Sequence, residues 1–336
     1  MDSIRFFAEK AIRELPQYEE IAQRYPDLEW IDDYQKFHRK TLRREKDSVI
    51  FARKRGAWLK PFHCYQNGPY AYFSLDVAEG CMFDCAYCYL QSYLNHGALV
   101  LFVDCDGVQA EMKQRREPNL WISTGLLSDS LLSEQYFPAV SRISGMIPPG
   151  SILELRSKSD DLSALNGTID RDSTVISWSL NPEGIARDYE YRAAPPERRL
   201  QAARRAIHLG FRVGFHFDPV FHFDGWQREY ARLFNSLQEF PHDRIAFLSI
   251  GLFRYMPDLG ATIRKRFPSH PLMTGEFFAA EDGKYHYFRP IRKEMYGFFS
   301  ALLVPWKAEA VPILYSMEPD PTLFLNGDAG RRARNK

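Results

Sequence analysis

The sequence predicts an α/β fold: a partial (β/α)6 TIM-type barrel with an N-terminal helical region and a C-terminal β-hairpin/helix extension. Between about residues 70 and 255, short runs of β-branched and aromatic residues alternate with segments of helical spacing. Such alternation predicts right-handed βαβ units and a parallel sheet. About six units fit into this length, fewer than the eight of a closed barrel, so we expect one side to stay open.

The strands of this barrel are expected at seven short apolar runs, which are 72–77, 99–103, 119–124, 151–156, 174–180, 211–217 and 245–250. Helical segments are expected between them near 130–145, 160–166, 196–209 and 225–240. The helix at 196–209 has the clearest pattern, because Leu200, Ala203 and Ile207 share one face and Gly210 follows as a stop signal.

These patterns divide the chain into four regions, 1–65, 66–255, 256–320 and 321–336. The first is rich in charge and helical spacing, so we expect two or three helices there. Its stretch 36–60 contains ten Lys or Arg residues, which either neutralise the phosphates of a nucleic acid or form a solvated helix face. The second region is the barrel, the third is the extension, and the fourth is expected to be a flexible tail.

The extension begins after the strand–helix alternation stops near residue 256. Asp282-Gly283 is a strong two-residue hairpin signal between strands expected at 276–281 and 284–289, and a helix is expected at 291–304. Aromatic and cationic residues mix in the second strand, where they either contact nucleic acid or pack on the barrel with their cations in water. The candidates for DNA contact are Lys284, Tyr285 and Arg289.

Composition favours an intracellular enzyme. The chain has 336 residues, 45% of them apolar, and a formal net charge of +1, so it has no strong polyelectrolyte character. We expect no membrane span, because no run approaches 18 apolar residues, and the N-terminus lacks the pattern of a signal peptide. Five cysteines, an odd number, suit a reducing compartment. We therefore expect a cytoplasmic location.

Cys81, Cys85 and Cys88 form a C-x3-C-x2-C motif directly after Gly80. Three thiolates this close in sequence can hold a [4Fe–4S] cluster, which normally takes four cysteines, so one iron would stay open for another ligand. A structural zinc site is an alternative, but it needs a fourth Cys or His nearby, and only Cys64, Cys105 and scattered histidines are available. The third possibility is that the three cysteines are buried and bind no metal.

In a barrel of this kind, the chemistry lies where the strands end and the loops converge. Polar residues stand at four such places: Ser128 and Asp129, Lys158, Ser179 and Asn181, and His216 and Asp218. The cysteine motif follows the first strand and falls at the same mouth. Each of these residues taken singly is compatible with a strand-end cap. His216 and Asp218 also form a candidate acid/base pair.

The cysteine motif, with an aromatic residue (Tyr87) before its last cysteine, resembles the radical S-adenosylmethionine (SAM) enzymes. More specifically, the chain resembles the spore photoproduct lyase family, which repairs a thymine lesion in DNA. The likeness covers about 60–310 and rests on six blocks, which are Gly80–Leu94, Thr124–Leu131, Leu155–Ser159, Val175–Pro182, Gly210–Pro219 and Gly225–Trp226. This resemblance implies a barrel of the radical SAM kind.

The resemblance also implies roles for single residues. The three cysteines would hold the [4Fe–4S] cluster, and Tyr89 would relay a hydrogen atom near the active site. The positions that match contacts to SAM are Tyr87, Ser128, Lys158 and Ser179. The hairpin would insert at the DNA lesion. The implied partners are lesion-containing DNA and an electron donor such as flavodoxin or ferredoxin, and we favour a monomer.

One departure from the family pattern is chemically serious. Leu126 occupies the position of the family's hydrogen-donating cysteine, and leucine has no hydrogen to give a carbon radical at a useful rate. Either Cys105 or Cys64 donates the hydrogen atom in place of a cysteine at position 126, or Tyr89 donates it alone, or the protein catalyses a different reaction. Three readings follow: a lyase acting on DNA damage, a radical SAM enzyme for another nucleoside, an RNA or a peptide, and a non-catalytic iron–sulfur interaction protein.

Overall fold

A computed structural model describes residues 4–37, 46–62, 65, 70–115, 117, 119–165 and 169–323. Three sequence predictions therefore concern parts outside the described residues. They are the contribution of Cys64, much of the basic stretch 36–60, and most of the tail at 321–336.

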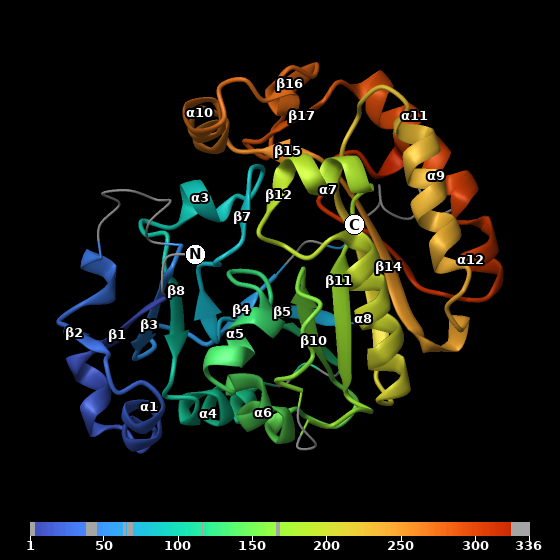
Figure 1. The fold of residues 1–336 in the computed structure, drawn as a ribbon. Helices are drawn as coiled ribbons and strands as arrows, with labels where there is room; N and C mark the ends of the chain where they lie inside the picture. Colours follow the sequence, from blue (N-terminus) through green and yellow to red (C-terminus); the bar gives the residue numbers. More distant parts are fainter. Residues whose placement is uncertain are drawn as a thin grey trace.

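The centre of the molecule is a curled eight-stranded sheet with the order β18-β14-β13-β11-β10-β9-β5-β4 (Figure 1). Its six consecutive parallel strands are β5 (Ala71–Leu75), β9 (Leu120–Ser123), β10 (Ile152–Ser157), β11 (Thr174–Ser179), β13 (Arg212–Val220) and β14 (Ile245–Leu252). At the two edges, β18 (Ile313–Tyr315) pairs parallel with β14, and β4 (Leu59–Pro61) pairs antiparallel with β5. The predicted partial barrel is confirmed.

Helices follow most of these strands. The longest are α8 (Pro196–His208) and α9 (Trp226–Leu237), both close to their predicted bounds. The apolar face of α8 is buried, as its spacing predicts. The other helices of the barrel are α3 (Leu90–Tyr93), α4 (Asp106–Gln114), α5 (Ser130–Tyr136), α6 (Ala139–Ile143) and α7 (Glu183–Tyr189).

The helix expected at 160–166 does not form in the described residues up to 165. Side chains there hydrogen-bond to nearby backbone instead: Ser159 Oγ accepts from the Asp161 amide (3.1 Å), and Asp161 accepts from the Ser163 amide (2.8 Å). Such local bonds compete with a helix for the same amide groups. The prediction was wrong because apolar spacing alone does not weigh this competition.

The N-terminal region forms a second, five-stranded sheet with the order β2-β1-β3-β8-β6, which lies at the left in Figure 1. Its strands are β1 (Arg5–Glu9), β2 (Glu29–Ile31), β3 (Ser48–Ala52), β6 (Ala78–Glu79) and β8 (Leu99–Phe102). The expected helical region is therefore wrong for most of the described part of this segment, in which α1 (Tyr18–Arg24) is accompanied only by short 3-10 helices.

The run predicted as a barrel strand at 99–103 also belongs to this second sheet. It forms β8, which pairs parallel with β3 rather than with a barrel strand. All five residues of β3 are buried, so this sheet has its own apolar interior. The sequence pattern of β8 shows only that it is a buried strand, and it does not show which sheet it joins.

The C-terminal extension contains a three-stranded antiparallel sheet of β15 (Arg254–Tyr255), β17 (Tyr285–Tyr287) and β16 (Phe277–Ala279). The predicted hairpin is confirmed, but its turn is longer than two residues. The Gly283 amide donates to the Ala280 carbonyl (3.0 Å), and Gly283 has a φ of +77° after that turn. The remaining helices are α10 (Pro257–Arg266), α11 (Arg289–Leu302) and α12 (Val304–Ala308).

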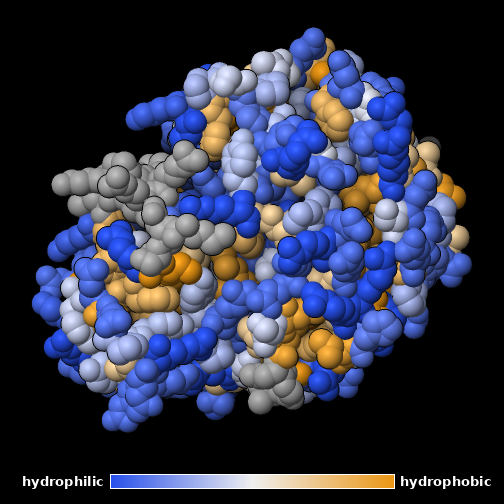
Figure 2. Space-filling view, in the orientation of Figure 1, coloured by the Kyte–Doolittle hydropathy of each residue, from blue (hydrophilic) through white to orange (hydrophobic). Residues whose placement is uncertain are grey.

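The inner face of the barrel is apolar at its base and polar above. A separate apolar cluster of Trp121, Ile152, Val175, Phe247 and Leu314 fills the base. Most of the molecular face in Figure 2 is hydrophilic. Within the described ranges, none of the helices has the length and apolar character needed to cross a membrane.

Candidate active site

A cavity of about 570 Å³ lies where the barrel strands end, bordered by the cysteine loop, the β9–α5 connection and the extension. The sequence-predicted residues that line it are Cys81, Cys85, Tyr87, Cys88, Tyr89, Ser128, Lys158, Ser179, Asp218 and Lys284. Leu126 and Asp129 line it as well. The structure thus brings residues from six separate segments to one place.

The cysteine loop is held in a fixed conformation by its backbone. Gly80 has a φ of +82°, and a Cβ there would lie 2.0 Å from the Ala98 carbonyl oxygen, so only glycine fits. The Gly80 amide donates to the Leu127 carbonyl (2.8 Å). The buried Lys46 ammonium donates to the carbonyls of Cys81 (2.7 Å) and Phe83 (3.0 Å). These bonds tie the loop to the β9–α5 connection and to the N-terminal region.

The thiols of Cys81, Cys85 and Cys88 are all unpaired with other cysteines. Burial raises the pKa of Cys81 well above its ordinary value and that of Cys85 to about 12, so iron binding must displace protons. Among the residues that the structure describes, no group of three or more His, Cys, Asp or Glu side chains is placed to bind one metal ion. A cubane cluster normally takes one cysteine thiolate at each of its irons. The three cysteines line one cavity, so they could bind three of the irons and leave the remaining iron open.

Asp129 organises the opposite wall of the cavity. One carboxylate oxygen accepts from the Leu132 amide (3.0 Å), which caps α5, and from the Ser157 hydroxyl (2.7 Å). The other accepts from the Lys158 amide (2.6 Å). Burial raises the pKa of Asp129, although these donors oppose the shift. Asp129 therefore fixes where β10 ends and where Lys158 enters the cavity.

Tyr87 and Lys158 face each other. The Lys158 ammonium lies 5.7 Å from the centroid of the Tyr87 ring, and that ring lies 5.2 Å from the ring of Phe221. The Tyr87 hydroxyl donates to Glu190, which is fully buried beneath the loop. Sequence reasoning missed Glu190, since nothing in its local pattern distinguishes it from an exposed glutamate in a connection.

Tyr89 lies beside Leu126. Its hydroxyl donates to the Leu126 carbonyl, and 43% of the residue remains exposed. The Tyr93 ring, 5.9 Å away edge-on, continues this aromatic wall. The side chain at the position of the expected thiol is thus an aliphatic one, with a phenol as its polar neighbour.

Cys105, the predicted substitute for the missing thiol, does not line the cavity. It is 2% exposed at the start of α4, and its sulfur faces the Phe102 carbonyl at 3.8 Å. Burial raises the pKa of Cys105 to about 12. The structure gives no support for a catalytic Cys105, because this residue follows β8 of the second sheet and lies outside the cavity wall.

His216 and Asp218 do not act as a pair, because each has another partner. Arg254 donates to both carboxylate oxygens of Asp218, at 2.9 and 3.3 Å, and His216 lies 2.6 Å from Glu154. Burial by itself raises the pKa of Asp218, but Arg254 outweighs it and the pKa is lowered. Asp218 lines the cavity as a carboxylate held ionised, so the predicted pairing with His216 does not form, although Asp218 itself lies at the site.

The three hairpin candidates lie in different environments. Lys284 lines the cavity and pairs with Asp282 at 3.0 Å. Tyr285 stacks on Tyr255 with ring centroids 5.2 Å apart. Arg289 begins α11 and pairs with Asp320 at 3.0 Å. Of the three, only Lys284 lies at the cavity.

Cations outnumber carboxylates along the described cavity wall. The cations are Lys60, Arg156, Lys158, Arg254 and Lys284, and the carboxylates are Asp76, Asp129 and Asp218. Sequence reasoning missed three of these cations as cavity residues, namely Lys60, Arg156 and Arg254. They share no local signal, because Lys60 lies within β4, Arg156 lies one residue before the end of β10, and Arg254 begins β15.

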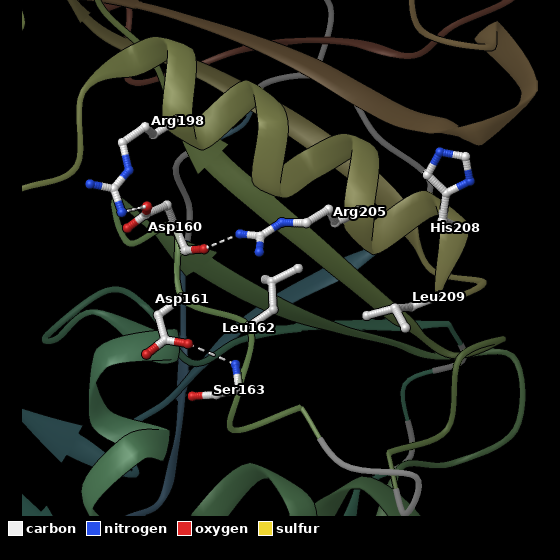
Figure 3. Close-up of a pocket in the computed structure, with 8 residues that line it drawn as sticks. All are labelled: Asp160, Asp161, Leu162, Ser163, Arg198, Arg205, His208 and Leu209. Carbon is white, nitrogen blue, oxygen red and sulfur yellow. Dashed lines mark hydrogen bonds and ion pairs between the residues drawn. The ribbon is translucent and has the colours of Figure 1, made fainter.

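A larger depression of about 810 Å³ lies on the outside of the barrel, between residues 160–163 and α8 (Figure 3). Arg198 and Arg205 reach from α8 to Asp160, whose carboxylate and carbonyl they contact at 2.5 and 2.6 Å. None of the predicted site residues lines this depression. Asp160 and the two arginines already contact one another, so we assign the chemistry to the smaller cavity.

A half-open barrel whose strand ends meet a three-cysteine loop defines an α/β protein of the radical SAM class. The sequence profile described as spore photoproduct lyase matches residues 57–294, more than half of the chain. The chain belongs to the spore photoproduct lyase family.

Curated relatives are distant. The chain is 26% identical over 244 residues to spore photoproduct lyase of Clostridium acetobutylicum, covering 69% of this chain and 73% of the relative. It is 25% identical over 220 residues to the Bacillus subtilis lyase, covering 62% and 64%. The structure of a cysteine-to-alanine variant of spore photoproduct lyase superimposes with a TM-score of 0.81 over 93% of this chain and 98% of that one, at 18% identity. That similarity shows a shared fold.

Proposed function

We propose that this protein is a radical SAM enzyme that acts on thymine photolesions in DNA. The observation that carries the proposal is a single cavity that joins the three cysteines to the strand-end polar groups and to an excess of cations. Cys81, Cys85 and Cys88 would hold a [4Fe–4S] cluster. When bound, the reduced cluster and SAM supply a 5′-deoxyadenosyl radical.

The residues of the chain bind and orient the reactants. Lys158 and Ser179 stand at strand ends opposite the cysteine loop, where they would contact SAM together with Ser128 and Tyr87. The surrounding walls exclude water, which protects a reactive radical from side reactions. Tyr89, beside Leu126, is the hydroxyl best placed to exchange a hydrogen atom with a substrate radical.

The cations favour a nucleic acid as substrate, because phosphates supply the matching negative charge. A damaged, poorly paired base is also the least costly to extrude from a duplex into a cavity. In agreement, a solved spore photoproduct lyase with the same fold is described with bound AdoMet and a dinucleoside spore photoproduct. DNA and a low-potential electron donor would be the partners.

A second candidate is a radical SAM enzyme with another nucleoside, an RNA or a peptide as substrate. Leu126 favours it, because repair of the spore lesion by the family reaction ends with hydrogen donation from a cysteine at that position. No thiol other than those of the three motif cysteines lines the described part of the cavity. The two candidates share the cofactors and differ in what the radical attacks.

One experiment separates the candidates. The protein is reconstituted anaerobically with iron and sulfide, reduced with dithionite, and incubated with SAM and DNA that contains the spore photoproduct. Release of 5′-deoxyadenosine together with restored thymine supports lesion repair. Deoxyadenosine without thymine recovery rejects this substrate and favours the second candidate. A reconstituted cluster with neither product contradicts the catalytic proposal.

The cysteine assignment has a matched control within the chain. Alanine at Cys81, Cys85 or Cys88 should abolish the absorbance and the iron content of the cluster. Cys105→Ala should leave both unchanged, because that thiol is also buried but lies outside the cavity.

A further inference from the structure

We propose that Glu190 and Arg199 form a buried clamp that positions the cysteine loop against the strand ends that would contact SAM. The inference rests on the proposed function and concerns the geometry of the same site. Both side chains are 0% exposed, and an Arg199 nitrogen lies 2.5 Å from a Glu190 oxygen. Neither residue lines the cavity, so both would act through others as positioning residues.

Glu190 joins the clamp to the cysteine loop in two ways. Its side chain accepts hydrogen bonds from the Tyr87 hydroxyl and from the side-chain amide of Asn181 (3.0 Å). Its backbone lies in β12 (Glu190–Tyr191), which pairs antiparallel with β7 (Asp84–Cys85), so that Glu190 is opposite Cys85. A movement of Glu190 would therefore shift both a cysteine ligand and the aromatic residue before the last cysteine.

Arg199 joins the clamp to the barrel. It donates to the Ser179 carbonyl at the end of β11 (2.9 Å) and to the Ala194 carbonyl (2.6 Å). The Ala194 amide in turn donates to the Lys158 carbonyl (3.2 Å), just beyond the end of β10. The clamp thus connects the three residues that come from different walls of the cavity, Tyr87, Lys158 and Ser179.

A buried ion pair adds little net stability compared with apolar side chains of similar volume, because both charges lose their hydration. Stability therefore gives a weak reason for a fully buried pair at this place. Fixed geometry gives a stronger one, since an ion pair with directed hydrogen bonds permits fewer arrangements than apolar contacts. The clamp would keep the cysteine loop within the small range of positions that allows bound SAM to react.

The test replaces both charges together, because loss of one partner would leave an unpaired buried charge and unfold the protein. Glu190→Met/Arg199→Leu should fold, while its SAM dissociation constant, measured by equilibrium dialysis on the reconstituted protein, should rise at least tenfold. Amide hydrogen exchange at residues 84–88 should also accelerate at least tenfold in the protein without its cluster. The matched control is Arg292→Leu/Glu318→Met, a buried pair outside the cavity wall, which should change neither quantity.

Unchanged SAM affinity or unchanged exchange in a folded double variant would overturn the clamp. If the double variant does not fold, hydrogen exchange of the cluster-free Tyr87→Phe variant decides, because this change removes only the hydroxyl that Glu190 accepts. Exchange at residues 84–86 accelerated at least threefold supports the clamp, and unchanged exchange overturns it. A wild-type protein that takes up a cluster but binds no SAM would instead contradict the proposed function. The two failures are therefore distinguishable.

Discussion

Leu126 is the residue at which the resemblance to spore photoproduct lyases is weakest and the structure most informative. Its carbonyl accepts the Tyr89 hydroxyl, and its side chain lines the cavity. The family resemblance predicts a hydrogen-donating cysteine at this position, and the residue is leucine. The Tyr89 phenol beside it is a candidate hydrogen source in the described cavity wall.

We predict that Leu126→Cys raises the ratio of repaired thymine to 5′-deoxyadenosine at least severalfold, because a thiol then stands where the product radical must be quenched. Tyr89→Phe should lower the same ratio at least severalfold in the otherwise native protein, with deoxyadenosine still formed. Both products are quantified by chromatography after a single incubation. If Leu126→Cys leaves the ratio unaltered, position 126 is not where hydrogen is donated.

Gly80 provides a stability prediction at the same scale. Gly80→Ala combines a left-handed φ of +82° with a Cβ 2.0 Å from a carbonyl oxygen, and it should reduce the free energy of unfolding by about 3 kcal/mol or more. Gly56→Ala is the matched control: its φ is +77°, but nothing lies within 4 Å of the added Cβ. It should lose only about 1–2 kcal/mol. Urea denaturation measures both, and equal losses would mean that the close contact is relieved by backbone movement.

At the scale of elements, β10 and β13 share a polar layer above the apolar base of the barrel. Glu154 on β10 accepts from Trp121 (2.9 Å) and Ser177 (2.7 Å), and lies 2.6 Å from His216 on β13. Burial, reinforced by Arg156, lowers the pKa of His216 to about 4, although Glu154 opposes the shift. His216 is therefore neutral at pH 7 and donates to an ionised Glu154.

This layer predicts a pH dependence of stability. An unfolded chain protonates His216 near pH 6.5, whereas the folded protein does so only near pH 4, so stability is lost as the pH falls through this window. Between pH 7.5 and 5, this one group should remove roughly 2 kcal/mol from the free energy of unfolding. His216→Gln should abolish that part of the loss, and His208→Gln, at an exposed position on α8, should not. Identical pH profiles for His216→Gln and wild type would contradict the assignment.

The elements also show how far a local pattern reaches. All six strands of the barrel and the helix α8 follow from the sequence pattern, because the strands are short, mostly buried runs and α8 buries one face at helical spacing. The segment 160–165 and the hairpin turn do not, because side-chain bonds to nearby amides and a left-handed Gly283 decide their conformations. The sheet that β8 joins depends on contacts with β3, about 50 residues away.

At the scale of the whole molecule, charge is nearly balanced, with a net value of +1, but it is not evenly placed. The described cavity wall has five cations against three carboxylates. This local excess, rather than the total charge, would attract a polyanion. The hairpin contributes one of the cations, Lys284, at the rim between the extension and the barrel.

We predict that binding of lesion-containing DNA weakens with added salt and that Lys284→Ala lowers the slope of log affinity against log salt by about 1, because one phosphate contact is lost. Arg289→Ala is the control. It removes an arginine that pairs with Asp320 and does not line the cavity, so the slope should stay the same. Fluorescence anisotropy at several salt concentrations measures both. A larger effect at Arg289 would place the DNA along α11 instead.

The sequence by itself determined the donor set of the cysteine loop, because three thiols within eight residues are close by covalent connection alone. It also determined the partial barrel and the edge at which its polar strand ends meet. Only the tertiary structure decided the partners of these groups. Arg254 rather than His216 pairs with Asp218, and Glu190 binds the Tyr87 hydroxyl from 103 residues away. The physical reason is that an ion pair or a buried hydrogen bond forms between whichever groups packing brings together, and one-dimensional spacing does not record that choice.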